Sequence, residues 1–448
     1  MKIRKRWIVL LLVVALSIAA ALLVKRYFTQ ITHGWDDLRG GTDPIPSIMM
    51  RPAAVTNTPE DWPSWRGRNQ DNTASLTLRT DWRGGLTRLW EVRYLCQGPD
   101  TAAWSCPVIQ GNHLVVMGRD AQHDLIFCLD PQTGALRWKT MYPAAAKDNY
   151  GPGARATPFI DGDRVYTLGR GGELLCLRLS DGNLLWRRDF DHEGGAAPEW
   201  GHSSSPLVAS NYLYIQGGEK LHAAAFHKTN GEPIWAVSGG PAGYASPVLA
   251  PFPLAGRNEL VIFHGEGLAG FDEASGSRLW NIDWKTSYGM NITTPVVAGN
   301  LVIATSTSGA FAAEVGSNGA AVRWKTRDLC GAHTDPLVIG SNLYGYSGSS
   351  LGNRGDFRCL DLATGKLRWK TPVMGGGTAI QVDKYLLCLD HKGNLFLVKP
   401  DPASFKLASS FPNAIPRVQE QSWTKPIVAG GNLYLRYRQR LLCYRLAR

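Results

Sequence analysis

The sequence lacks any closely spaced pair of cysteines. Its eight cysteines include no adjacent pair, no Cys-x-x-Cys and no Cys-x-x-Cys-His. These absences exclude a redox dithiol of the usual spacing and a covalently attached haem. Four cysteines occupy equivalent positions in repeated segments, where a small buried apolar side chain fits: Cys128, Cys176, Cys359 and Cys443. Cys96 and Cys106 flank one loop, and the sequence leaves open whether they form a disulfide.

Acidic residues are absent from the first 26 positions, which contain six lysines and arginines. The formal net charge of +11 therefore leaves only +5 for the rest of the chain. An excess of this size does not indicate binding to nucleic acid. The chain also lacks a metal-binding pattern, because the histidine and the acidic residues of the insertion at 191–202 fit no defined spacing.

Charge is also absent from residues 7–24, which follow a basic segment at 1–6. A helix of eighteen residues spans roughly 27 Å, close to the hydrocarbon thickness of a bilayer. We predict an uncleaved transmembrane signal-anchor helix at 7–24, followed by a proline-containing tether at 25–60. The flanking basic residues favour a cytoplasmic N-terminus, which puts the rest of the chain on the periplasmic or exported side of the inner membrane. The alternative is a signal peptide cleaved at the small residues 19–21.

One segment is present twice almost letter for letter, as FCLDPQTGALRWKT at 127–140 and RCLDLATGKLRWKT at 358–371. Each copy is typical of a strand, a tight turn and a second strand that ends on a tryptophan. Asp130 or Asp361 can accept backbone N–H groups in the turn, and Gly134 or Gly365 can adopt the positive φ that closes it. The chain is therefore predicted to reuse one hairpin unit.

Further copies of the hairpin end on tryptophans that lie 44 to 49 residues apart, at positions 138, 186, 235, 280, 324 and 369. A proline opens an apolar run before most hairpins, at positions 107, 158, 206, 247, 295, 336 and 426. Proline is tolerated at the first residue of a strand, since its missing N–H removes no ladder bond there. Four short antiparallel strands in a repeat of this length are typical of a propeller blade.

Counting the repeats predicts an all-β, eight-bladed β-propeller over residues 61–448. Seven units run from about 102 to 407, and the last segment, 423–446, contains only three strands of an eighth. The segment LTRLWEVR at 86–93 has the sequence of a fourth strand with no repeat before it. We therefore expect the N- and C-terminal strands to pair in one sheet and to close the ring.

The pattern D-x-x-T-G-x-x-x-W at 130–138 and 361–369 resembles the pyrroloquinoline-quinone-type (PQQ-like) propeller repeat family. The resemblance extends from about residue 61 to the C-terminus and includes a tryptophan-rich lead-in, DWPSWRGRNQDNTAS, at 61–75. Within this family the chain is similar to the group of the outer membrane protein assembly factor BamB. That resemblance implies a non-catalytic, monomeric scaffold for a protein partner in the cell envelope, with no cofactor. The departure is the anchor, because members of that group are lipoproteins and the first cysteine here is Cys96.

The other branch of the family implies a PQQ-dependent dehydrogenase. There the quinone stacks between a tryptophan and a ring of two bonded adjacent cysteines, beside a calcium ion and a catalytic aspartate. This chain has no adjacent cysteines and little sequence beyond the blades. The enzyme, with PQQ and calcium as cofactors, therefore remains the alternative.

Candidate binding residues lie just before each opening proline, since the first strand of a blade lines the propeller axis. These segments are expected to converge on one mouth of the central channel. They contribute Trp104, Arg155, Trp200, His202, Tyr244, Tyr288, Asn291, His333, Asp335 and Trp423. Aromatic, cationic and hydrogen-bonding groups suit a planar or anionic ligand. They suit a docked protein segment or a purely structural wet channel equally well.

Overall fold

The computed structural model describes residues 55–448 apart from 57, 59, 99–100, 145–147, 149, 349–354 and 419–421. The predicted basic segment, the predicted membrane helix at 7–24 and most of the predicted tether lie outside the described residues. Within the described part of the chain, no helix has both the length and the apolar character needed to cross a membrane.

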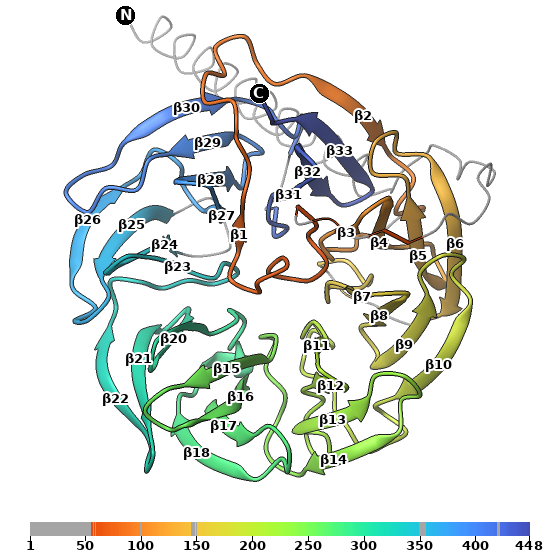
Figure 1. Ribbon diagram of the computed structural model, residues 1–448, viewed down its shortest axis with the longest axis vertical. Coiled ribbons are helices and arrows are strands. Elements are labelled where there is room, and N and C mark those ends of the chain that lie inside the picture. The colour runs from red at the N-terminus through yellow and green to blue at the C-terminus, as the bar shows by residue number, and fades with distance from the viewer. Residues whose placement is uncertain are drawn as a thin grey trace, which may run out of the picture.

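The described strands form eight sheets arranged in a ring around a central axis (Figure 1). Each sheet has four antiparallel strands, and one sheet has a short fifth strand, β1 (Thr73–Ala74), that pairs in parallel with it. We number the sheets as blades 1 to 8 in chain order. This architecture confirms the predicted all-β, eight-bladed propeller.

The first four blades follow the chain without interruption. Blade 1 contains β3 (Val108–Gln110), β4 (His113–Arg119), β5 (His123–Leu129) and β6 (Leu136–Pro143). Blade 2 contains β7 (Phe159–Asp161), β8 (Arg164–Leu168), β9 (Glu173–Arg178) and β10 (Leu184–Asp189). Blade 3 contains β11 (Leu207–Ala209), β12 (Tyr212–Ile215), β13 (Ala223–His227) and β14 (Pro233–Val237). Blade 4 contains β15 (Val248–Phe252), β16 (Arg257–His264), β17 (Gly267–Asp272) and β18 (Arg278–Asp283).

The last four blades include one that combines both ends of the propeller. Blade 5 contains β19 (Val296–Ala298), β20 (Leu301–Ser306), β21 (Gly309–Gly316) and β22 (Gly319–Thr326), and it follows a short 3-10 helix, η1 (Ser287–Gly289). Blade 6 contains β23 (Leu337–Ile339), β24 (Asn342–Gly348), β25 (Gly355–Asp361) and β26 (Leu367–Thr371). Blade 7 contains β27 (Gly377–Val382), β28 (Tyr385–Asp390), β29 (Leu395–Val398) and β30 (Leu407–Phe411). Blade 8 contains β31 (Ile427–Ala429), β32 (Asn432–Tyr437), β33 (Arg440–Arg445) and β2 (Arg88–Val92).

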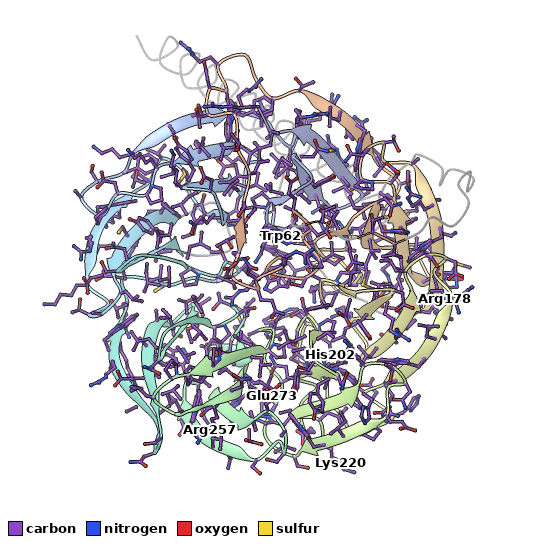
Figure 2. The ribbon with its side chains drawn as sticks, in the orientation of Figure 1. Trp62, Arg178, His202, Lys220, Arg257 and Glu273 are labelled. Carbon is purple, nitrogen blue, oxygen red and sulfur yellow. The ribbon has the colours of Figure 1, made fainter. Side chains whose placement is uncertain are left out.

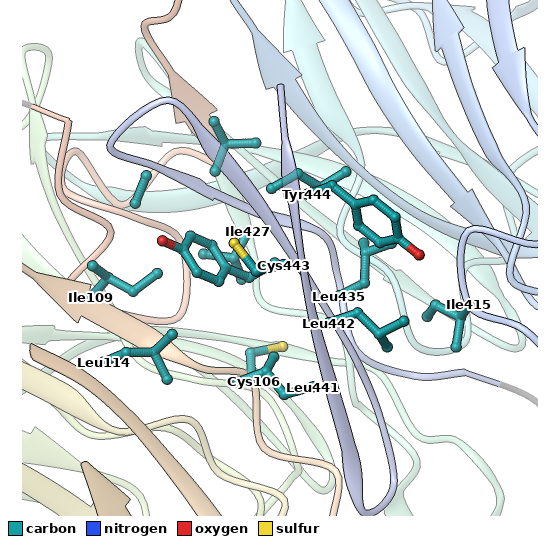
Figure 3. Close-up of a cluster of buried hydrophobic side chains, with 14 of the residues drawn as sticks. Cys106, Ile109, Leu114, Ile415, Ile427, Leu435, Leu441, Leu442, Cys443 and Tyr444 are labelled. Atoms are coloured by element: carbon teal, nitrogen blue, oxygen red, sulfur yellow. The ribbon is translucent and has the colours of Figure 1, made fainter. Parts of the chain in front are cut away.

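Ring closure takes place in blade 8, as predicted. Strand β2 pairs antiparallel with β33, with Trp90 opposite Cys443 and Val92 opposite Leu441. A continuous cluster of buried side chains then joins blade 8 to blades 1 and 7, and Figure 3 shows Leu442 of β33 in it with Leu114 of β4. The strand pairing and this core together join the two ends of the propeller.

The repeated hairpin also fastens six of the eight blades to the next blade through its closing tryptophan. In blade 1 the Asp130 carboxylate accepts the backbone N–H groups of the turn, as the sequence predicted. The Trp138 indole donates its N–H to the Leu179 carbonyl of blade 2 at 2.8 Å. The ring also packs on Gly182, which has φ +74° and where a Cβ atom would lie 2.5 Å from the ring. Corresponding tryptophans donate to the next blade at positions 90, 186, 235, 324 and 369.

The repeated cysteines lie in the third strands, as predicted, each opposite the closing tryptophan of its own blade. Cys128 pairs with Trp138 in register, and Cys176 pairs with Trp186. A bulge follows each of these pairs and turns the outer strand. All eight cysteines are free thiols, including the pair at 96 and 106.

Candidate functional site

Side chains just before the opening prolines join neighbouring blades around the axis. Each of five backbone N–H groups donates to a side-chain oxygen of the next blade. The bonds are Cys106 to Thr157 (3.1 Å), Thr157 to Ser205 (2.9 Å), Ser205 to Ser246 (3.0 Å), Ser246 to Thr294 (3.2 Å) and Thr294 to Asp335 (2.8 Å). The chain of bonds fixes the inner ends of blades 1 to 6 and places the preceding residues around one hollow.

That hollow is a cavity of about 370 Å³ on the axis. Eight of the ten predicted site residues line it: Trp104, Arg155, Trp200, Tyr244, Tyr288, His333, Asp335 and Trp423. Its other lining residues are Trp65, Tyr150, Ser203, Ser205, Ser246, Met290, Ile292 and Thr294, which the sequence analysis did not single out. The convergence on one mouth that the repeats predicted is therefore present in the structure.

His202 and Asn291 do not line the cavity. The buried His202 ring packs edge-on against Phe190, with the ring centroids 5.3 Å apart. The Asn291 amide donates to the carbonyls of His264 at 2.7 Å and Trp284 at 3.0 Å, and so holds the loop behind the cavity wall. Both residues are four positions before their proline, and successive residues of an extended chain face opposite sides.

The position three before the proline faces the cavity in all seven blades that have the proline. These residues are Trp104, Arg155, Ser203, Tyr244, Ile292, His333 and Trp423. A fixed offset from the proline is therefore the sequence signal that would have found Ser203 and Ile292 and left out the two misplaced residues.

One wall of the cavity is an aromatic cluster built from blades 1, 6 and 8. The Trp423 ring stacks on the His333 imidazole, with centroids 5.0 Å apart and an interplanar angle of 14°. It also packs against Trp104 at 4.8 Å and Tyr150 at 5.9 Å. The Trp104 indole donates its N–H to the Tyr150 carbonyl at 2.6 Å, which fixes the orientation of that ring.

A second aromatic cluster forms another part of the wall and comes from blades 2 to 4 and η1. The Trp200 ring lies 5.8 Å from Tyr244 and 5.7 Å from Tyr288. Tyr288 has a left-handed backbone, with φ +57°, and its side chain is 73% exposed. A bulky residue in this conformation costs about 1–3 kcal/mol, and such strain often marks a functional position.

The chain at 61–79, which begins with the lead-in segment (61–75), crosses the axis and supplies Trp65 to the cavity (Figure 1). Trp62, near the centre of the ring in Figure 2, exchanges two backbone hydrogen bonds with Ile109, at 2.9 and 2.8 Å. The Pro63 carbonyl accepts the N–H of Ile160 of blade 2 at 2.8 Å. Farther along, β1 pairs with blade 7 and Leu78 bridges to blade 8. These contacts link blades 7, 8, 1 and 2, which are neighbours in the ring. The Trp65 indole N–H reaches across the axis and donates to Thr294 Oγ1, directly before blade 5, at 3.0 Å.

A buried cluster of three charges anchors the lead-in segment. Arg66 Nε donates to Asp335 Oδ2 at 3.0 Å, and Lys425 Nζ lies 3.4 Å from the same oxygen. Burial would raise the pKa of Asp335, but Arg66 and Lys425 outweigh it and hold that pKa below its usual value. Lys425 Nζ also lies 3.5 Å from the centroid of the Trp65 ring, a cation–π contact. Two cations thus share one carboxylate beneath the cavity wall.

A second cluster of three charges stands at the cavity wall. Arg155 and Arg170 both bind Asp148, at 3.1 and 2.6 Å, and both also donate to the Trp200 carbonyl. Burial lowers the pKa of Arg155, while Asp148 raises it. Here too, one carboxylate serves two cations.

Two polar atoms of the aromatic wall have no hydrogen-bond partner among the described residues, Trp423 Nε1 and His333 Nδ1. Burial, together with the neighbouring His391 and Arg155, lowers the pKa of His333 to about 3. The imidazole is therefore neutral at physiological pH and has one N–H to donate. These atoms leave the wall with unused hydrogen-bonding capacity.

The fold and the cavity define a class of protein, the β-propellers of PQQ-like repeats. The family described as "Outer membrane protein assembly factor BamB" matches residues 122–371, more than half of the chain. The chain belongs to this family. The outer membrane protein assembly factor BamB of Shewanella oneidensis is 26% identical over 258 residues, which cover 52% of this chain and 60% of that relative. The match thus spans about three fifths of the relative's length.

Solved structures share the fold at low sequence identity. BamB from Moraxella catarrhalis has a TM-score of 0.56 and 15% identity, over 80% of this chain and 97% of that one. Quinohemoprotein alcohol dehydrogenase from Comamonas testosteroni has a TM-score of 0.59 and 11% identity, over 86% of this chain and 80% of that one. At these identities the likeness concerns the fold alone.

The cavity does not fit a quinone with a calcium ion. Calcium takes six to eight oxygen ligands, and Asp335 is the one carboxylate among the described lining residues. Its Oδ1 accepts the Thr294 N–H and its Oδ2 binds Arg66, while two cations beside it would repel a third. Among the residues that the structure describes, no group of three or more His, Cys, Asp or Glu side chains could hold a metal ion.

Proposed function

We propose that this protein is a non-catalytic, protein-binding scaffold of the cell envelope. Membership of the BamB family supports this reading. The observation that carries it is that these titratable groups at the cavity are poorly suited to proton transfer: Asp335 and Asp148 are each bound by two cations, and the pKa of His333, about 3, lies far below physiological pH. A proton-transfer catalyst needs an acid or base that is free to react. The aromatic surface that remains resembles the centre of a protein interface.

The proposal includes the anchoring of a monomeric propeller. The uncharged segment at 7–24 would cross the inner membrane, and the tether at 25–60 would hold the ring on the exported side. The partner would then be an envelope or membrane protein that reaches the mouth of the channel. Alkaline extraction of membranes and protease access to intact spheroplasts test this part, since an uncleaved anchor resists extraction and leaves the propeller open to protease.

Photo-crosslinking from the channel mouth tests the scaffold. A benzoylphenylalanine at position 288 of the full chain, in its own cells, should capture a discrete envelope protein, because the Tyr288 side chain is 73% exposed at the mouth. The matched control is the same replacement at Leu184, which is 54% exposed on the outer strand β10. Equal labelling from both positions, or none from position 288, contradicts the scaffold. Saturable binding of PQQ and calcium with dye-linked alcohol oxidation would favour the dehydrogenase instead.

A further inference from the structure

The charges around the cavity are unbalanced in the same way at two places. Asp335 is shared by Arg66 and Lys425, and Asp148 is shared by Arg155 and Arg170. Each cluster keeps one positive charge in excess. Four of the six side chains are no more than 6% exposed and the other two no more than 13%. A buried charge without a counter-charge is costly, so an anion at the cavity would be favourable.

The aromatic walls indicate which other chemical groups an occupant of the cavity needs. The clusters around Trp423 and Trp200 offer ring faces and edges, and Arg155 lines the cavity with them. Trp423 Nε1 and His333 Nδ1 supply unpaired polar atoms on the first of these walls. A volume of about 370 Å³ lies at the small end of the range for ligand pockets, roughly 300–1,000 Å³. Such a hollow accommodates one large side chain and a neighbouring polar group.

We propose that the cavity is the anchor site for an acidic, aromatic peptide segment of the partner. The segment presents a tryptophan, tyrosine or phenylalanine next to an aspartate or glutamate. Its ring enters between the clusters of Trp423 and Trp200, and its carboxylate accepts hydrogen bonds at Arg155. This inference rests on the proposed scaffold function and names the chemistry of the partner.

A protein segment fits the mouth better than a free small molecule. Tyr288 and Tyr150 are 73% and 40% exposed beside the cavity, so the apolar surface continues outward from it. A small ligand enclosed in the cavity would leave those rings in water, whereas a peptide chain would cover them. Aromatic anchors that enter a pocket within a wider contact surface are characteristic of protein interfaces.

Binding of short blocked peptides to the full-length protein tests the inference. The probe is acetyl-Gly-Asp-Trp-Gly-amide, followed by isothermal titration calorimetry in low salt. Replacing the peptide's Asp by Asn removes the charge-assisted bonds and should weaken binding at least about tenfold. Replacing its Trp by Ala should weaken binding by a similar factor or more, because the ring supplies the buried surface. Indole-3-acetate serves as the small-molecule arm.

Two protein variants assign the binding to this cavity. Arg155→Gln should abolish the preference for Asp over Asn in the peptide. Tyr288→Ala removes an exposed ring without disturbing the core and should weaken the Asp-Trp peptide about fivefold to tenfold. Leu184→Ala on the outer strand β10 is the matched control and should change the affinity less than twofold.

The outcomes separate this inference from the scaffold itself. Binding that depends on both peptide side chains and on Tyr288 supports the inference. Equal affinity for the Asp and Asn peptides overturns it, as does binding of indole-3-acetate at least as tight as that of the peptide. If position 288 captures an envelope protein while the peptides do not bind, the scaffold stands and the acidic aromatic anchor is wrong. If neither experiment gives a signal, both proposals fail.

Discussion

Replacement of Asp335 by Asn should destabilise the whole propeller. The change keeps the size of the side chain and an oxygen that can accept the Thr294 N–H. It removes the negative charge that Arg66 and Lys425 share at 3.0 and 3.4 Å. All three charged side chains are no more than 6% exposed, so solvent cannot replace the lost partner. Two like charges would then face each other inside the ring.

The size of the effect follows from burial and from the size of the protein. Breaking a buried ion pair by removing one partner costs about 3–5 kcal/mol. The entropy of unfolding is about 2.1 cal/mol/K per residue, so the propeller of roughly 390 residues gains about 0.8 kcal/mol/K on unfolding. The ratio predicts a fall in Tm of about 4–6 °C. The low pKa of Asp335 means that its contribution is present at neutral pH and is lost as the pH falls through that pKa.

Lys425→Met provides the matched control, because it removes one of the two cations and leaves Arg66 paired with Asp335. It loses the cation–π contact with Trp65 and a hydrogen bond to Asn72. These losses amount to about 1–2 kcal/mol, or about 1–3 °C in Tm. The change should therefore cost less than Asp335→Asn, although it removes more of the side chain.

The double variant distinguishes charge balance from packing. If uncompensated charge causes the damage, Asp335→Asn combined with Lys425→Met should be more stable than Asp335→Asn alone. Differential scanning calorimetry at pH 7 of the two single variants, the double variant and the wild type measures this. Additive losses in the double variant, or a smaller loss from Asp335→Asn than from Lys425→Met, would refute the reasoning.

Three further changes test other parts of the fold. Burial raises the pKa of Asp124 to about 6 from its usual value of 3.8. The free energy of unfolding of the wild type should therefore fall by up to about 3 kcal/mol relative to Asp124→Asn as the pH rises from 4 to 7. Tm measured against pH tests this, and parallel profiles of the two proteins would contradict it. Gly182→Ala should destabilise the fold by well over 1 kcal/mol, because residue 182 has a positive φ and contacts Trp138. Gly162→Ala, at φ +60° but next to open space, should cost about 1 kcal/mol. Equal midpoints of urea unfolding would show that the contact with Trp138 contributes nothing. Deletion of 423–448 removes three strands of blade 8 and should give a protein that aggregates in size-exclusion chromatography. A soluble truncated protein that melts cooperatively would contradict the ring closure.

The blades and their closure could be predicted from the sequence because each repeat contains the residues that determine its strands and turns. The opening prolines directly precede the innermost strands, as Pro107 precedes Val108 and Pro295 precedes Val296. The hairpin aspartate, glycine and tryptophan then fix a turn, an outer strand and a contact with the next blade. Six blades show the same tryptophan bond, whereas Trp280 instead donates to Glu259 of its own blade at 2.5 Å.

The candidate site could be predicted less fully, because part of its wall does not belong to the repeat. Trp65 comes from the lead-in segment, and its partner Thr294 lies 229 residues away in the chain. Asp148 and Tyr150 lie in the connection between β6 and β7, outside the repeated strands. A repeat specifies its own strands and the offset from its proline, but it contains no information about a segment that crosses the ring from outside.

The difference between repeated and non-repeated residues also explains why the axial cavity differs from an empty pore. The repeats alone would leave a ring of serine and threonine hydroxyls around the axis, which the blades use to bond to one another. The charged replacements at this level are Asp335 in blade 6 and Lys425 in blade 8, and these are the residues that bind Arg66 of the lead-in segment and the Trp65 ring. The positions that depart from the repeat therefore bind a segment that lies outside the repeats. By the same logic, Arg155, the other charged departure that faces the cavity, is where an external segment is expected to dock.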